Sequence, residues 1–123
     1  IVSSFHTPQD EESKRLPFET AAAGAVGLET LLPASLQLFH SQSVSLGKLI
    51  RTMTLNPAIL LNLPSGRITP GAPADLIIFD ADIPFILDRE TLKSKSKNTP
   101  YDGQKLQGKV RRTIVSGKTI FEC

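Results

Sequence analysis

Helical and extended patterns occupy separate parts of this chain, and this separation limits its possible folds more than any other feature. Apolar residues at helical spacing lie before Gly66, whereas the apolar runs that are typical of strands lie after it. This order predicts two substructures that meet near Gly66. With 123 residues, the chain is long enough for one domain with a core, but far shorter than the ~250 residues that a closed (β/α)₈ barrel needs.

Proline and capping residues set the bounds of three predicted helices. Pro33 fits only in a first helical turn, so the first helix begins near its cap, Thr30. Ser45 caps the second helix, and Asn56-Pro57, a cap followed by proline, starts the third. The predicted helices are 30–40, 46–53 and 58–62.

Extended apolar runs predict four strands in the second part of the chain. Pro84 places one of them at a sheet edge, and Ser116-Gly117 forms the turn of a terminal hairpin. Residues 3–17 and 91–108 are polar and rich in turn-forming residues, so we expect loops there. The predicted strands are 76–79, 83–87, 110–115 and 118–121.

Charge is unevenly distributed along a chain whose formal net charge is only +2. Residues 1–33 carry two basic and five acidic groups, whereas residues 89–123 carry nine basic and three acidic groups. The basic segment fits an anionic partner or a solvated surface. The lack of Trp and the single Tyr argue against a nucleic-acid platform. No apolar run reaches the ~18 residues of a membrane span, so no membrane association is expected.

The cysteine content indicates the redox compartment of the chain, and its first residues indicate whether it is part of a longer protein. Cys123 is the single cysteine, so neither an internal disulfide nor a zinc-ribbon pair can form, which favours a reducing cytoplasm. The chain opens with Ile1-Val2, an apolar pair typical of the middle of a strand, without an initiator Met or a signal-peptide pattern. We therefore expect it to be a piece of a longer protein.

Four motifs together carry a family resemblance. Residues 66–76, GRITPGAPADL, resemble the G-x-(I/L)-x-x-G-x-x-A-D-L turn and strand of the amidohydrolase superfamily. Residues 94–103, SKSKNTPYDG, resemble the S-(K/R)-S-x-N-T-P-x-x-G loop of dihydroorotases. Residues 24–33 resemble their G-x-x-G-L-E-T-x-L-P signature, and residues 110–121 their closing hairpin. The chain is thus similar to dihydroorotases over nearly its whole length.

The resemblance implies an α/β fold with two parts. Residues 1–60 would form the last strand, a loop and the last helices of a metal-dependent (β/α)₈ barrel. Residues 61–123 would form the C-terminal part of the small composite β-domain beside it. The seven earlier barrel strands would lie outside this chain, and the surfaces that face them would be exposed and apolar, so we expect a homo-oligomer.

The resemblance also implies an activity and a cofactor. Dihydroorotases interconvert dihydroorotate and N-carbamoyl-aspartate in pyrimidine biosynthesis. Family members hold zinc with an H-x-H pair, a carboxylated lysine and two further histidines, and the metal lowers the pKa of bound water to about 7. An Asp after the last barrel strand moves the proton. These metal ligands would precede Ile1, so we expect no metal site and no catalysis from this chain alone.

The last-strand motif of the family, T-D-H-A-P-H, is where this sequence departs from the pattern. Aligned on Pro8, Phe5 occupies the position of the catalytic aspartate and Gln9 that of a substrate-binding histidine. Phenylalanine can neither take up a proton nor bind zinc. A shift of one residue places Ser4 there, with the same consequence. Asp10 is the nearest carboxylate that a proton relay could use.

Backbone groups and two histidines complete the candidate site. The N–H groups of Ala23 and Gly24 correspond to substrate-binding groups of the family, and their small size allows close approach. Tight packing of loop against helix explains these small residues equally well. His6 matches the histidine of the motif, but a lone histidine is more often a packing or surface residue. His40 ends a predicted helix, where a cation complements the dipole.

Three functions remain open at this point. The chain is part of a dihydroorotase; or it is part of a non-catalytic dihydroorotase-like subunit that assembles with aspartate carbamoyltransferase, as Phe5 and Gln9 favour; or it is part of another cyclic amidohydrolase. The loop over 94–100 argues against the last of these.

Overall fold

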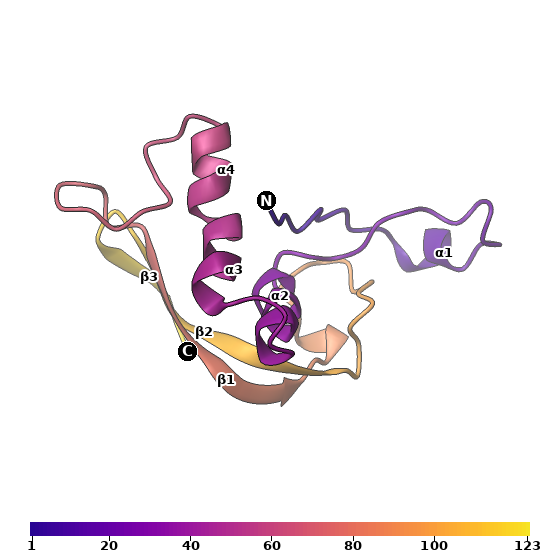
Figure 1. Cartoon of the computed structure of the whole chain (residues 1–123). Helices are drawn as coiled ribbons and strands as arrows, with labels where there is room; N and C mark the ends of the chain where they lie inside the picture. Colours follow the sequence, from indigo (N-terminus) through magenta and orange to yellow (C-terminus); the bar gives the residue numbers. More distant parts are fainter.

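The computed structural model describes residues 1–123 and combines four short helices with a three-stranded sheet (Figure 1). A 3₁₀ turn, Arg89–Thr91, follows the first strand. The helices are α1 (Glu11–Lys14), α2 (Leu31–His40), α3 (Leu46–Met53) and α4 (Leu55–Leu60). The strands are β1 (Leu76–Ile86), β2 (Lys105–Val115) and β3 (Lys118–Glu122). No helix is both long enough and apolar enough to cross a membrane.

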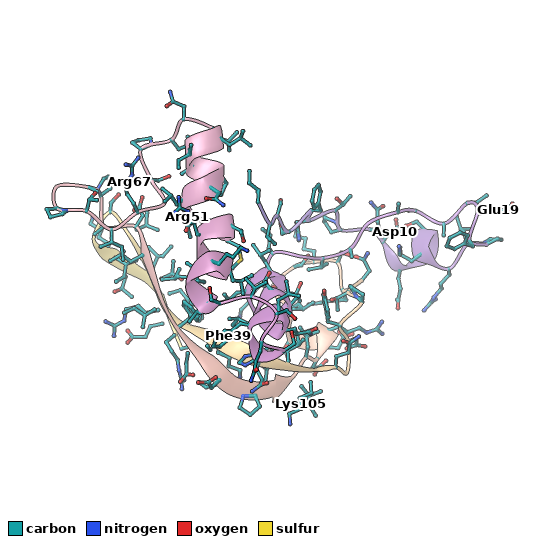
Figure 2. The ribbon with its side chains drawn as sticks, in the orientation of Figure 1. Asp10, Glu19, Phe39, Arg51, Arg67 and Lys105 are labelled. Atoms are coloured by element: carbon teal, nitrogen blue, oxygen red, sulfur yellow. The ribbon has the colours of Figure 1, made fainter.

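The arrangement of these elements follows the predicted order of helices before strands. Figure 1 shows α2 over the curved sheet, with α3 and α4 continuing in one line away from it. Helix α1 lies on an arm that projects away from the sheet, and Asp10 and Glu19 mark this arm in Figure 2.

The sheet is antiparallel with the order β1-β2-β3, and it corrects two sequence predictions. The predicted strands 76–79 and 83–87 are one strand, β1, because irregular pairing between Asp80 and Pro84 lets the strand continue through polar residues. The predicted loop over 91–108 ends earlier, since β2 begins at Lys105. Pro84 does lie on an edge strand, as predicted.

The terminal hairpin is confirmed. Val115 pairs with Lys118, and both turn residues between them have positive φ, 49° at Ser116 and 77° at Gly117. Two-residue turns of this kind match the twist of the flanking strands.

Two of the three predicted helices are confirmed in their bounds, but their capping chemistry is not. Neither Thr30 nor Ser45 caps its helix with a side-chain hydrogen bond. The Thr30 hydroxyl instead donates to the Gly27 carbonyl at 3.3 Å. Helix α4 begins at Leu55 rather than at residue 58, and the Asn56 side chain accepts a hydrogen bond from Arg51 instead of capping.

The loop predicted over 3–17 contains one turn of helix, α1. Its cap is Asp10, whose carboxylate accepts a 2.7 Å hydrogen bond from the Ser13 amide. Two glutamates lie in the first turn, where the positive end of the helix dipole stabilises their negative charge.

The core of the chain is small. Only 11 of 123 residues are buried, so much of the apolar surface has no cover within this chain. One buried cluster joins the loop before α2 to the start of β2 and to the segment between β1 and β2: Val26, Leu87, Leu92 and Leu106. Elsewhere Leu36 of α2 is fully buried against Gly108 of β2, where a Cβ would lie 2.2 Å from its Cδ1 atom. Helix α2 thus packs directly on the sheet. The predicted division of the chain into a barrel part, 1–60, and a β-domain part, 61–123, remains a prediction.

Candidate functional site

Two glycines allow the loop over 23–27 to lie directly against the N-terminal segment. His6 pairs with Ala25 in an isolated parallel bridge, and the Thr7 amide donates to the Ala25 carbonyl at 3.0 Å. A Cβ at Gly24, whose φ is +129°, would lie 2.4 Å from the Thr7 carbonyl oxygen. A Cβ at Gly27 would lie 2.4 Å from the carbonyl oxygen of residue 4. Both glycines of the G-x-x-G motif are therefore required for this close contact, because any side chain at either position would clash with the backbone.

The loop over 94–100 holds these two segments from the other side. The Asn98 side chain accepts from the Gln9 amide at 3.1 Å and donates to the Gly24 carbonyl at 3.1 Å. The Asn98 carbonyl accepts from the Val26 amide at 2.8 Å. The Ser96 hydroxyl can donate its one proton either to the Gln9 carbonyl oxygen or, at 2.6 Å, to the Asn98 side-chain oxygen.

Further polar contacts fix the same loop to its surroundings. The Glu29 carboxylate accepts from the Lys93 and Ser94 amides at 2.8 and 3.2 Å. The Lys97 ammonium donates to the Leu92 carbonyl at 2.6 Å. Outside this loop, the Lys14 ammonium joins α1 to the segment before Gly24 by donating to the Ala22 carbonyl at 2.7 Å. Glu29 and Ser94 are 65 residues apart in the sequence, and their contact makes one connected unit of the motifs over 24–33 and 94–103.

A polar groove of about 1150 Å³ opens along this unit, lined by residues 8–11, 14–15, 24–25, 89–90 and 94–100. Five cationic and three acidic side chains lie in its wall: Lys14, Arg15, Arg89, Lys95 and Lys97 against Asp10, Glu11 and Glu90. Arg15 and Arg89 are paired with Glu11 at 3.4 and 3.6 Å, whereas Lys95 has no ion pair. The excess of cations favours an anionic ligand.

The structure brings only part of the predicted site together. Gln9 and Gly24 both line the groove. Phe5 lines a neighbouring hollow of about 640 Å³, to which Gly24 also contributes. Ala23 lines neither and is exposed.

Phe5 is 84% exposed and has a φ of +43°. That conformation is uncommon for a bulky side chain. The benzyl group thus makes no contribution to the core of this chain, and it supplies no proton-transferring atom.

Asp10 is committed to capping α1. Hydrogen bonds from the Ser13 amide and hydroxyl hold the pKa of this exposed carboxyl below its ordinary value. A lowered pKa makes the carboxylate a weak proton acceptor at neutral pH. The geometry does not favour Asp10 as the relay that the sequence left open.

The two histidines do not form a metal centre. The His6 Nδ1 atom accepts a 3.1 Å hydrogen bond from the Gly27 amide, which leaves only Nε2 free. The His40 Nε2 atom lies 3.0 Å from the Ala81 carbonyl, where it joins α2 to β1. No three His, Cys, Asp or Glu side chains lie close enough to hold an ion. The residues of this chain therefore do not fit a zinc site of their own.

Sequence reasoning identified the loop over 94–100 as a motif but missed what it contacts. Asn98 and Ser96 join Gln9 to Gly24, and Glu29 anchors the start of the loop. The only sequence signal for these contacts was the motif itself, a polar, proline-containing loop. Nothing in it names the segments that the Asn98 side chain binds, which lie 74 to 89 residues earlier in the sequence.

This arrangement belongs to a known class of protein. The Amidohydrolase family model matches residues 11–120, so the chain is a member of the amidohydrolase family.

Among curated sequences, the chain is similar to dihydroorotases. It is 47% identical to that of Ehrlichia chaffeensis over 122 residues, covering 99% of this chain and 27% of the relative. It is 43% identical to that of Aquifex aeolicus over 125 residues, covering 99% of this chain and 29% of the relative. The chain thus spans little more than a quarter of the length of these relatives.

Solved structures confirm the predicted fold class. The dihydropyrimidinase of Brevibacillus agri superimposes with a TM-score of 0.86 at 20% identity, covering 95% of this chain and 27% of that one. The L-hydantoinase of Arthrobacter aurescens gives a TM-score of 0.79 at 34% identity, covering 85% of this chain and 24% of that one. The chain has the fold of part of an amidohydrolase-family enzyme.

Proposed function

We propose that this chain is part of a dihydroorotase, a cyclic amidohydrolase of pyrimidine biosynthesis that interconverts dihydroorotate and N-carbamoyl-aspartate. The observation that carries the proposal is similarity along the whole chain, 43–48% identity to five dihydroorotases over at least 98% of its residues. The loop over 94–100, the segment with the more specific motif, is the one that joins Gln9 to Gly24.

The groove supports an anionic substrate of this kind. Dihydroorotate and N-carbamoyl-aspartate both carry carboxylates, and the wall of the groove has more cationic than acidic side chains. In this proposal Gln9, Ala23 and Gly24 contribute to substrate binding, with Gln9 and Gly24 in the groove wall and Ala23 beside it.

Metal chemistry would need residues outside this chain. In the chemistry that the resemblance implies, zinc would supply a reactive hydroxide at neutral pH. Residues 1–123 provide one histidine near the groove, with one ring nitrogen already bonded. Their part in the proposed function is to bind and orient the substrate, not to hold the ion.

A non-catalytic role is the second candidate, and Phe5 is the observation that favours it. A benzyl side chain at the position of the family aspartate cannot move a proton. The whole protein would then be a cytoplasmic, dihydroorotase-like subunit that forms homo-oligomers and assembles with aspartate carbamoyltransferase.

One experiment separates these candidates. The whole protein that contains this chain is purified, and turnover of dihydroorotate is measured together with bound zinc, with dihydrouracil and hydantoin as comparison substrates. Turnover of dihydroorotate with bound zinc supports the enzyme and excludes the non-catalytic role. Absence of turnover, with aspartate carbamoyltransferase co-purifying, supports the non-catalytic subunit. Turnover of hydantoin or dihydrouracil alone would assign another cyclic amidohydrolase.

A further inference from the structure

Asn98 is the residue through which three separate segments of this chain meet. Its side-chain oxygen accepts from the Gln9 amide, and its side-chain nitrogen donates to the Gly24 carbonyl, each at 3.1 Å. Its backbone carbonyl accepts from the Val26 amide at 2.8 Å. The partners lie 89, 74 and 72 residues away in the sequence, so no local structure would bring them together.

The chemistry of the amide explains why asparagine suits this position. One end of the side-chain amide, its oxygen, must accept a hydrogen bond from a backbone N–H. The other end, its nitrogen, must donate to a backbone carbonyl. An aspartate could accept from Gln9 but would place a second oxygen against the Gly24 carbonyl. Ser96 completes the arrangement, because its hydroxyl lies within hydrogen-bonding distance of both the Asn98 side-chain oxygen and the Gln9 carbonyl oxygen and donates its one proton to either.

The two backbone segments that Asn98 joins both line the polar groove. The contact therefore fixes the spacing of backbone groups that line the groove. The buried apolar cluster around Val26 and Leu106 supports the same region independently, so the fold does not depend on Asn98 alone.

We propose that Asn98 is a positioning residue, which holds the Gln9 and Gly24 backbones at the spacing that an anionic cyclic-amide substrate requires. The substrate class rests on the function proposed above. Asn98 itself acts through Gln9 and Gly24 and need not touch the substrate. Loss of one hydrogen bond of this kind corresponds to about a tenfold change in affinity.

The test compares Asn98→Asp, Asn98→Ala and Ser96→Ala in the whole protein. Gln104→Ala is the matched control, since this amide also bonds a backbone carbonyl, that of Pro100 at 2.8 Å, but lies outside the groove wall. Steady-state kinetics with dihydroorotate separate KM from kcat. Amide hydrogen exchange reports on the Gln9 and Val26 N–H groups directly.

The expected result has a kinetic and an exchange part. Asn98→Asp raises KM about tenfold with kcat within about twofold, because binding geometry changes while the active fraction does not. Asn98→Ala raises KM further and accelerates amide exchange at Gln9. Ser96→Ala has a smaller effect on KM. The control, Gln104→Ala, changes neither KM nor the exchange rate. A residue that only stabilises the fold would lower the active fraction, and so kcat, without moving KM.

Two outcomes overturn the inference in different ways. If wild-type protein turns over dihydroorotate and Asn98→Asp leaves its KM unchanged, the positioning role is wrong and the proposed function stands. If wild-type protein does not turn over dihydroorotate, its binding is measured by equilibrium dialysis. Binding that Asn98→Asp weakens keeps the positioning role in a non-catalytic subunit, and absence of binding overturns both proposals.

Discussion

Two regions of the chain differ in how far the chain itself completes their contacts. Around Asn98, the contact is made by polar groups and by glycines that admit backbone against backbone. At the end of α4 and in the segment that follows it, which together form the apolar region beyond α4, large side chains are exposed instead: Ile59, Leu60, Leu61, Leu63 and Ile68. The first region is completed by residues of this chain, whereas the second presents an apolar surface that nothing within the chain covers. The first region is thus defined by specific hydrogen bonds, and the second by apolar side chains that remain exposed.

The largest effect is expected from Gly24→Ala. The new Cβ would lie 2.4 Å from the Thr7 carbonyl oxygen, and the φ of +129° disfavours any side chain. Overpacking and backbone strain together should destabilise the protein by about 3 kcal/mol, measured by urea unfolding.

Gly71→Ala is the control for backbone strain alone. Gly71 also has a positive φ, +82°, but a Cβ added there would meet no atom within 4 Å. Its substitution should cost only about 1 kcal/mol. Equal losses in the two variants would show that the close contact at Gly24 contributes nothing.

The apolar region beyond α4 is expected to drive self-association of the isolated chain. Exposed leucines at 60 and 61 supply much of this surface, so Leu60→Lys with Leu61→Lys should shift the chain toward monomer in light scattering. Ile120→Lys, at an exposed position on β3, is the matched control and should change association less. A monodisperse wild-type monomer would contradict this view of the surface.

Phe5→Asp tests whether a missing carboxylate is all that separates this chain from the family pattern. Phe5 lines the hollow beside the groove rather than the groove that contains Gln9. The substitution should therefore leave turnover of dihydroorotate by the whole protein within about threefold of wild type, with Phe5→Asn as the uncharged control. A large gain in kcat for Phe5→Asp alone would show that position 5 does meet the reacting atoms.

The smallest effect is expected at the arm that carries α1. The pKa of Asp10 is lowered by its hydrogen bonds to Ser13, so the ionised cap is fully present above the ordinary Asp value and is lost as pH falls through the lowered one. Exchange of the Ser13 amide should therefore accelerate, relative to the intrinsic rate, as the pH falls below the ordinary Asp value. Asp10→Asn keeps a capping oxygen without a charge, and an identical pH response in this variant would exclude the carboxylate as the cause.

Local patterns predicted the elements whose causes are local. The hairpin around Ser116-Gly117 follows from its turn chemistry, and α2 and α3 follow from apolar spacing. The break predicted within β1 was wrong because Asp80 and Asp82 resemble loop residues, while pairing with β2 carries the strand past them.

The candidate site was predicted less completely, for a physical reason. The motifs named Gln9 and Gly24, which the structure places in the wall of one groove. A bond between Asn98 and residues more than 70 positions away, however, leaves no periodic pattern in the sequence. Similarly, the role of Asp10 as a helix cap depends on α1, a single turn that composition alone assigns to a loop.

The most direct test is a crystal structure of the whole protein with N-carbamoyl-aspartate bound. The account predicts the ligand in the groove against the backbones of Gln9 and Gly24, with the Asn98 side chain bonded to both and no contact from Phe5 to an ion. A ligand bound away from this groove, or a carboxylate of this chain reaching a metal ion at the position assigned to Phe5, would contradict it.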